Sequence, residues 1–337
     1  MPQYELEPIA FPLGAAHDAL VAGFEQATIY HSRAWWDFLR ATQPITPIAY
    51  LIHEEGEQIG FLLGGMVRKG PLRMFGSPLP GWTTPYLGPV VRRVTAADRL
   101  TTAILERLHA DRFAHYELRS DTMSWWTPPA VTRATALHSF EEPGRTIVAE
   151  VAADDAAILQ SFSKSTRKTV RRAQRAGLEA QLDTAPSFLD DYYEQLTEVF
   201  AKRSLKPTYS RSRIAALIEH LRPTGSLLTT RVTSEGLSIA TRIDLLDSST
   251  MYSFGSASRQ ATLKLAPNEL ARYFVMVEAA KRGITTYNMT GGGDYKLKFN
   301  AEAVDHRRRI GSRPTLMAAR SVYKFGKKTV RNLRRAA

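Results

Sequence analysis

The fold class is indicated most clearly by residues 251–294, MYSFGSASRQATLKLAPNELARYFVMVEAAKRGITTYNMTGGGD. The first seven of these residues are typical of a strand, and a polar loop follows them. Pro267 then marks the first turn of a helix that ends at Gly283. That helix is apolar nearly all round, which predicts that it is buried. ITTYNMT at 284–290 indicates a second strand. This order favours an α/β fold, in which ligands bind at the carboxyl ends of the strands.

Six residues directly after this second strand are candidates for contact with a substrate. They are Gly291, Gly292, Gly293, Asp294, Lys296 and Lys298. Glycines allow a close approach between backbone and substrate. We therefore expect the glycines to let the chain pass a substrate closely while the charged residues face it. The two lysines share a face only if the segment is a strand, so the sequence leaves open which of them points inward.

Positive charge is concentrated in two segments. The chain has 337 residues, a net charge of +12 and an isoelectric point near 9.9. Six basic residues lie between Lys164 and Arg175 and seven between Arg320 and Arg335, with no acid in either segment. On a helix, the first segment forms one basic face. An excess of this kind indicates a polyanionic partner, such as nucleic acid, an anionic membrane surface or a phosphate-bearing substrate; the alternative is a solvated helix face.

The loop between the first strand and the buried helix is a second candidate anion site. It contains Ser256, Ser258, Arg259 and Lys264. Backbone N–H groups at the beginning of a helix favour anions, and a nearby Arg or Lys strengthens the effect. The alternative is an ordinary connection, because the chain has neither a Walker-type pattern nor a GxGxxG after a strand.

Several classes of protein are excluded by what the sequence lacks. Without cysteine, it has no disulfide, thiolate metal site or Cys nucleophile. The eight histidines are scattered and form no metal-binding pair, so no metal is expected, and no GxSxG elbow supports a hydrolase. No apolar run approaches about 20 residues, and the N-terminus does not read as a secretory signal. We expect a cytoplasmic protein, with the inner face of the membrane as a further possibility.

Two similar halves are expected from the order of elements. Helix, strand, Glu-Gly turn, strand, strand, helix and strand occur twice, with the turns at Glu55-Gly56 and Glu235-Gly236. The predicted division is 1–145, 146–319 and a basic tail at 320–337. Within it, 154–177 is predicted to be one helix and 121–145 a loop.

Four segments, in their order along the chain, resemble the Fem-type branch of the GNAT acyltransferase superfamily, including the BioF2-like acetyltransferases. They are YHSRAWWDFL at 30–39, SKSTRKTVRRAQRAGLE at 163–179, YSFGSASRQATLKLAPNEL at 252–270 and GITTYNMTGGGDYKLKFNAE at 283–302. The chain departs from the family pattern at two places. Asn300 follows Phe299 where relatives carry Gly, and Leu265-Ala266-Pro267-Asn268 replaces the glycine-containing pyrophosphate loop.

The resemblance implies two tandem GNAT-like domains of α/β (α+β) class, each a mixed, mostly antiparallel sheet flanked by helices. It implies transfer of an acyl or aminoacyl group from acyl-CoA or aminoacyl-tRNA, used as a co-substrate, to an amine. No tightly bound cofactor is expected. The acceptor is a peptidoglycan precursor in Fem-type enzymes, and a sugar, lipid or small amine in other relatives. Acyl transfer needs a donor of hydrogen bonds or positive charge near the oxyanion, and neither metal nor Cys.

On this interpretation each candidate residue receives a role. Lys298 or Lys296 stabilises charge, Asp294 orients the amine or accepts its proton, and Tyr252 lines the cleft. Ser256, Arg259, Lys264 and Asn268 are assigned to the donor. The residues assigned to the acceptor or to tRNA are Lys164, Arg167, Lys168, Arg171, Gly291, Gly292, Gly293, Trp35 and Tyr86. The competing interpretations are a non-catalytic RNA-binding protein and a protein held at an anionic membrane by its basic tail.

Overall fold

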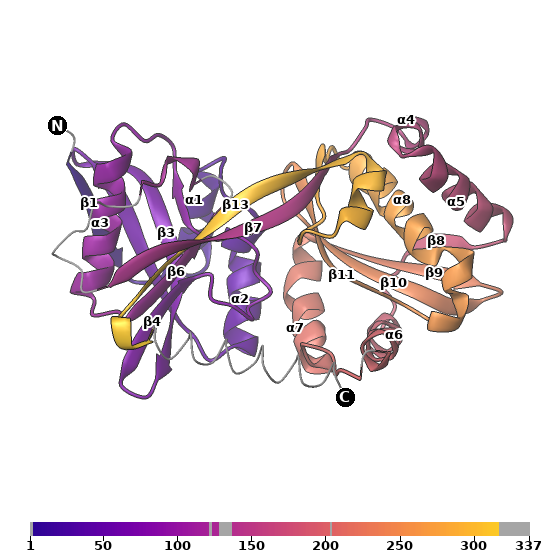
Figure 1. Cartoon of the computed structure of the whole chain (residues 1–337), viewed down its shortest axis with the longest axis horizontal. Helices are drawn as coiled ribbons and strands as arrows, with labels where there is room; N and C mark the ends of the chain where they lie inside the picture. The colour runs from indigo at the N-terminus through magenta and orange to yellow at the C-terminus, as the bar shows by residue number, and fades with distance from the viewer. Residues whose placement is uncertain (1–2, 121–122, 128–136, 203, 317–337) are drawn as a thin grey trace. The chain divides into compact units, whose positions relative to one another are not determined.

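The computed structural model of the chain describes residues 3–120, 123–127, 137–202 and 204–316. The chain divides into two compact units (Figure 1). The second unit comprises Ser32–Thr42 and Gly144–Asp305, and the first comprises the remaining described residues. The basic tail predicted at 320–337 lies outside the described residues. No helix in the described part of the chain is both long and apolar enough to cross a membrane.

The first unit is built on a mixed sheet with strand order β1-β2-β3-β4-β6-β13, in which β5 also pairs with β3. Only the β4–β6 pair is parallel among the strand pairs described for this unit. Its elements are β1 (Tyr4–Ile9), α1 (Ala15–Ala22), η1 (Ile29–His31), β2 (Thr46–Glu54), β3 (Glu57–Lys69), β4 (Leu72–Ser77), β5 (Pro89–Val91), α3 (Ala97–Ala110), β6 (His115–Arg119) and η2 (Met123–Trp125). The strands β7 (His138–Glu150) and β13 (Ala301–Ser312) contribute residues to both units.

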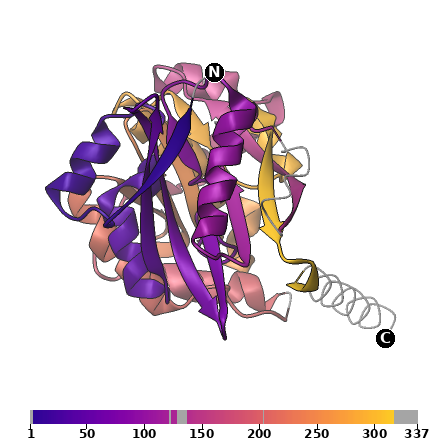
Figure 2. The ribbon, with the colours of Figure 1, turned by 90° about the vertical axis from the view of Figure 1, so that its left-hand side faces the viewer.

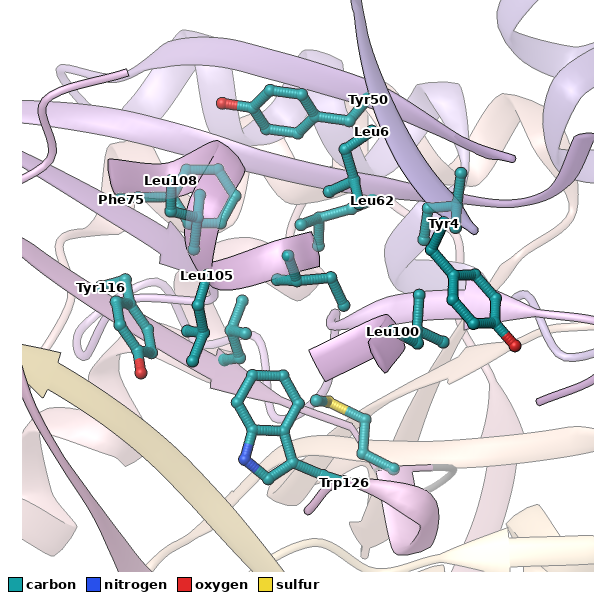
Figure 3. Close-up of a cluster of buried hydrophobic side chains, with 14 of the residues drawn as sticks. Tyr4, Leu6, Tyr50, Leu62, Phe75, Leu100, Leu105, Leu108, Tyr116 and Trp126 are labelled. Carbon is teal, nitrogen blue, oxygen red and sulfur yellow. The ribbon is translucent and has the colours of Figure 1, made fainter. Parts of the chain in front are cut away.

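Helix α3 covers one face of this sheet (Figure 2). Leu100, Ile104 and Leu108 recur at every fourth position, so they form a single stripe, and all three are fully buried. They pack with Leu62 and Tyr116 of the sheet in one apolar cluster (Figure 3). Burying each of these three side chains stabilises the fold by roughly 1.5–3 kcal/mol.

The second unit has the strand order β7-β12-β11-β10-β9-β8. Its remaining elements are α2 (Arg33–Thr42), α4 (Asp155–Ser161), α5 (Lys164–Arg175), β8 (Glu179–Leu182), α6 (Phe188–Ala201), α7 (Arg211–Leu221), η3 (Arg222–Thr224), β9 (Leu227–Ser234), β10 (Leu237–Leu246), β11 (Thr250–Ser258), η4 (Gln260–Leu265), α8 (Pro267–Ala280), β12 (Thr286–Asn288) and η5 (Asp294–Phe299). Helices α5 and α8 contact one another, and α6 contacts β10 and β11 (Figure 1).

The burial predicted for the helix that begins at Pro267 is confirmed. No residue of α8 is fully exposed. Leu270 and Ala271 pack against Val170 of α5 and Ala240 of β10. The helix is therefore held between α5 and the sheet, which places its N-terminal turn beside the end of β11.

Two expectations about local structure are wrong. Residues 154–177 do not form one helix, because the chain is extended at Phe162 between α4 and α5. Ser163 then begins the second helix by accepting a hydrogen bond from Thr166 N at 3.3 Å, the geometry of a Ser N-cap. The segment predicted to be a loop at 121–145 includes the first residues of β7, which begins at His138.

The two Glu-Gly turns are confirmed. Glu55 and Gly56 have φ angles of 51° and 82°, and Glu235 and Gly236 have 50° and 78°. Positive φ at both central residues is the geometry of a type I′ hairpin turn. Each turn joins two long antiparallel strands, β2 to β3 and β9 to β10.

Candidate active site

The opening between β11 and β12 is the structural feature around which the candidate residues of the second unit gather. The two strands pair in parallel only between Thr250–Tyr252 and Thr286–Asn288. β12 then ends, whereas β11 continues along β10 as far as Ser258. Ligands of α/β sheets bind where neighbouring parallel strands diverge at their carboxyl ends.

A β-bulge lies on β11 at this opening. Ile243 pairs with Gly255 and Asp244 with Ser253, so Phe254 has no opposite residue on β10. On one side of the bulge, the hydroxyl groups of Tyr192 and Tyr209 lie 2.9 Å apart. Tyr192 is fully buried, and burial raises its pKa well above the ordinary value. Both tyrosines therefore remain neutral hydrogen-bonding groups.

Gly255 is required by the close approach of Tyr192 to the bulge. A Cβ atom at position 255 would lie 2.3 Å from Tyr192 Oη, well inside van der Waals contact. We expect Gly255→Ala to lower the free energy of unfolding by about 1–3 kcal/mol, as overpacking does. Tyr192→Phe in the same chain removes the clashing oxygen and should restore part of that loss. Urea denaturation of the three variants tests this, and equal stability of Gly255→Ala and the unmodified protein would contradict it.

The other side of the opening has a buried group of charges that the sequence did not reveal. Arg242 and Asp244 are adjacent inward residues of β10 and are almost fully buried. The Arg242 guanidinium donates to both Asp244 oxygens, at 2.6 and 2.7 Å, and to Ser253 Oγ at 2.8 Å. Tyr287 of β12 donates to the same carboxylate at 2.9 Å. Burial raises the pKa of Asp244, and Arg242 opposes this effect.

The glycine run follows β12 and begins with a tight reversal of the chain. Thr290 and Gly291 have φ angles of 50° and 57°, a region that glycine adopts without steric cost. Asn288 Oδ1 accepts a hydrogen bond from Thr290 N at 3.0 Å, and Thr290 Oγ1 donates to Ser253 O at 3.1 Å. The loop after β12 is thus tied to β11 across the opening.

Asp294–Phe299 is a 3-10 helix, η5, and this separates the two candidate lysines. With three residues per turn, positions two apart lie on different sides. Lys296 Nζ donates to Met289 O at 2.8 Å and to Thr290 O, and reaches Gly291 O at 3.5 Å. Lys298 instead forms an ion pair with Glu269 of α8 at 2.8 Å. Lys296 is therefore the lysine that points toward the glycine loop.

Lys296 also lies in a cationic environment. Burial, together with the charges of Arg272 and Arg242, lowers its pKa to about 8. Its charge is therefore held at some cost in free energy, a common feature of functional sites. Asp294, by contrast, is mostly exposed and forms an ion pair with Arg145 at 2.9 Å.

The predicted donor residues occupy the loop between β11 and α8. Arg259 forms an ion pair with Glu194 of α6 at 2.8 Å, and Asn268 donates to Ser258 Oγ at 3.0 Å. The first turn of α8 carries Pro267, which has no N–H, and the acidic Glu269. The backbone of Lys264 accepts a hydrogen bond from Arg172 of α5. Of the other residues assigned to this region, Ser256 is exposed and Tyr252 is buried.

Helix α5 carries all six of the predicted basic residues. Among the described residues, none of the six lies within ion-pair distance of a carboxylate. Arg167 and Arg172 bond to backbone carbonyls, whereas Lys168, Arg171 and Arg175 line a surface depression of about 540 Å³. The inward face of the helix is apolar, so the charges concentrate on one side.

Two predicted substrate residues are buried in packing. Trp35 of α2 is fully buried, with its ring centre 5.0 Å from that of Phe38 and the two rings tilted by 54°. Tyr86 of the first unit is also buried, with its ring 5.7 Å from the Arg119 guanidinium. Contact of either with a substrate stays a prediction. Within the described residues, no group of His, Asp and Glu side chains could hold a metal ion.

Residues 160–298 match the family model described as "Acetyltransferase (GNAT) domain". The chain is similar to the solved structure titled "Crystal structure of FemX", with a TM-score of 0.65 and 14% identity over 89% of this chain and 96% of that one. It is similar to L-PGS from Bacillus licheniformis, with a TM-score of 0.53 and 12% identity over 93% and 95% of the two chains. A tandem GNAT protein from the clavulanic acid biosynthesis pathway gives a TM-score of 0.52 and 10% identity over 92% and 98%. Comparison with curated proteins gives no match.

These comparisons confirm the expected fold, a mixed α/β architecture with two GNAT-like domains. The GNAT part of the resemblance is confirmed by the domain match, and the similarity to the FemX structure shows that the chain shares its fold. The acyltransferase class is confirmed by the same domain match, which covers α5, β11, α8 and the glycine loop.

Proposed function

We propose that this protein is an N-acyltransferase that takes an aminoacyl group from aminoacyl-tRNA and transfers it to an amine of a cell-envelope precursor. The choice of aminoacyl-tRNA as donor rests on the basic face of α5. Six cations on twelve residues have no described carboxylate partner. Such a face suits a phosphate backbone, since binding there releases the counterions of the nucleic acid.

The N-terminal turn of α8 is a poor site for the pyrophosphate of CoA, which supports the same choice. In this turn Pro267 supplies no N–H, and Glu269 adds a negative charge that repels a phosphate. The ion pair with Lys298 neutralises that carboxylate but also occupies the lysine. A helix N-terminus attracts anions through free N–H groups and positive charge, and this one offers few of either.

The reaction joins the acceptor nitrogen to the carbonyl carbon of the donor and breaks the ester bond to the ribose oxygen. The proton lost by the amine is taken up in exchange by that ribose oxygen. Negative charge develops on the carbonyl oxygen in between, and positive charge nearby stabilises it. Lys296 supplies such a charge beside the opening between β11 and β12. Its hydrogen bonds go to backbone carbonyls, so it acts through its charge and by ordering the glycine loop.

Asp294 is proposed to orient the acceptor amine from the exposed end of the same loop and to accept the proton that its ammonium form must lose before it attacks. Its carboxylate is largely open to solvent, with Arg145 on one side only. The acceptor class is inferred from the Fem-type resemblance alone. A lipid-linked or sugar amine is the alternative acceptor.

A donor screen tests the proposal. The purified protein is incubated with total tRNA charged with radiolabelled amino acids, or with acyl-CoAs, together with a panel of amine acceptors. We expect a labelled amide that disappears after RNase treatment. A product formed from acyl-CoA and insensitive to RNase would contradict the tRNA donor. Salt-dependent RNA binding without any product would identify a non-catalytic RNA-binding protein.

The basic face of α5 gives a second, quantitative prediction. The triple variant Lys168→Gln, Arg171→Gln, Arg175→Gln removes the three cations that line the surface depression. We expect KM for charged tRNA to rise about tenfold or more, and the slope of log affinity against log salt to fall by about 2–3. The double variant Lys281→Gln, Arg282→Gln is the control, because these cations are already paired with Glu278. An equal effect of both variants would show that the position on α5 does not matter.

A further inference from the structure

Arg272 of α8 is a buried guanidinium beside the candidate active site. Only 6% of the residue is exposed. Its guanidinium lies 4.6 Å from the ring centre of Phe299 and 5.8 Å from that of Tyr295. Aromatic faces attract a cation, but they do not provide acceptors for the five N–H donors of an arginine.

The guanidinium is incompletely satisfied by its neighbours. Nε has no hydrogen-bond partner, Nη1 reaches the sulfur of Met289 at 3.7 Å, and the oxygen that hydrogen-bonds to the side chain is the hydroxyl of the exposed Tyr295. Sulfur is a weak acceptor. In the described part of the chain, no carboxylate lies within ion-pair distance of Arg272, and both oxygens of Asp244 are bonded to Arg242. Burying a charge without a counter-charge is costly, and so is leaving its Nε without an acceptor, so a group of this kind calls for an explanation.

The surroundings of Arg272 carry an excess of positive charge. Arg242 lies close enough to lower the pKa of Arg272, and both arginines lower the pKa of Lys296. The negative charge of Asp244 has the opposite effect and raises the pKa of Arg272. Three cations and one carboxylate leave a net charge of about +2 at the opening between the strands. Burial together with Arg242 lowers the pKa of Arg272 to about 10, so it stays charged at neutral pH.

The side chain of Tyr295 covers Arg272. Tyr295 stands on η5, directly after the glycine run, and 62% of it is exposed. A Cβ atom at Gly293 would lie 2.8 Å from the Tyr295 ring, so the glycine leaves the space that the ring occupies. Rotation of this one exposed side chain would uncover the guanidinium without unfolding the backbone around it.

We infer that Arg272 is the base of an oxyanion-binding subsite, opened by movement of Tyr295, which takes a phosphate or carboxylate group of a substrate. An oxyanion there would supply the acceptor atoms that Nε lacks and would offset the excess positive charge. The inference rests on the proposed function only in that an acyl-transfer substrate brings the oxyanion to this site. A phosphodiester of the RNA donor and a carboxylate of the acceptor are the two sources of this shared chemistry.

The test measures anion binding without acyl transfer, so it remains readable if the proposed reaction is wrong. Thermal unfolding is followed with inorganic phosphate, with acetate, and with chloride at matched ionic strength. We expect phosphate or acetate at ten or more times its dissociation constant to raise Tm by about 2 °C or more. A shift with phosphate identifies the phosphodiester as the source, and a shift with acetate identifies the carboxylate. No shift with either anion overturns the inference.

Three variants test whether the rise in Tm with phosphate or acetate depends on Arg272. Arg272→Met should abolish it, and Arg282→Met, in the turn that follows the same helix and paired with Glu278, should retain it. An equal shift in Arg272→Met and the unmodified protein overturns the inference. If Arg272→Met does not fold, Tyr295→Ala decides the matter, because this exposed residue can be removed without opening the core. We expect Tyr295→Ala to bind the anion at least threefold more tightly, and an unchanged or weaker affinity overturns the inference.

Discussion

Asp244→Ala is expected to lower the free energy of unfolding of the second unit by about 3–5 kcal/mol, more than any other single carboxylate-to-alanine change within the site. The reason is that the substitution leaves Arg242 without its carboxylate partner. The Arg242 guanidinium would then be buried without a carboxylate, and removing one member of a buried ion pair costs about that much. Tyr287 would lose its acceptor as well. Urea denaturation followed by circular dichroism measures the change.

The control is an exposed pair of the same chemistry. Asp190 and Arg211 form an ion pair at 2.5 Å, but both side chains are more than half exposed. Asp190→Ala is expected to change stability by less than about 1 kcal/mol, because solvent screens such pairs. If Asp244→Ala were as mild as Asp190→Ala, the pair would have to be open to water in solution, and the site would not be built as described.

The elements of the second unit follow from local sequence signals. Pro267 and Gly283 bound α8, and the Glu-Gly turns set the register of two hairpins. These signals act within a few residues, so a sequence reading can detect them. The break at Phe162 is not predicted because neither Gly nor Pro marks it and the cap depends on a single serine.

The charged centre of the site could not be predicted in the same way. Arg242 and Asp244 stand two apart in IATRIDLL, which places both on one face of a strand. An arginine and an aspartate in an otherwise apolar strand are a signal, but their partner Tyr287 comes from another strand. Arg272 is likewise visible as a charge within an apolar helix. Pairing across strands and helices depends on tertiary contacts, which a single sequence does not specify.

The sequence leaves open which of the two lysines points toward the glycine loop, and the geometry of η5 decides this. Spacing alone placed Lys296 and Lys298 on one face if the segment was a strand. The segment is a 3-10 helix, so Lys296 binds the carbonyls of the glycine loop and Lys298 binds Glu269. Their roles in catalysis remain predictions that mutation separates.

Lys296→Met is expected to lower kcat by about 10²–10³-fold, the loss typical of removing a group that stabilises developing negative charge. The variant also frees the carbonyls of Met289 and Thr290, so the glycine loop should become less ordered. KM for the donor is expected to change less than kcat, because the charge matters most in the transition state. Lys298→Met keeps Lys296 in place and should reduce kcat by less than about tenfold. The reverse order of the two effects would assign the role to Lys298.

The pH dependence distinguishes a charged Lys296 from a general base. Its pKa is lowered to about 8, from an ordinary value of 10.5, by burial and by neighbouring arginines. If the charge is what matters, kcat is constant below pH 8 and falls as the pH rises through that value. If Lys296 acted as a general base, kcat would instead rise as the pH increases through 8. Lys296→Arg keeps its charge above this range, so the variant should show no fall near pH 8.

The free energy of unfolding should change with pH in the opposite direction to kcat, because both depend on the protonation of Lys296. Between pH 8 and about 10.5, the unfolded chain binds a proton at this lysine that the folded chain has released. The contribution of Lys296 to the free energy of unfolding therefore increases with pH across this window, while activity decreases. Subtracting the Lys296→Met profile from that of the unmodified protein isolates this contribution. A flat difference would mean that Lys296 is as hydrated in the folded protein as in the unfolded chain, and that the fall in kcat has another origin.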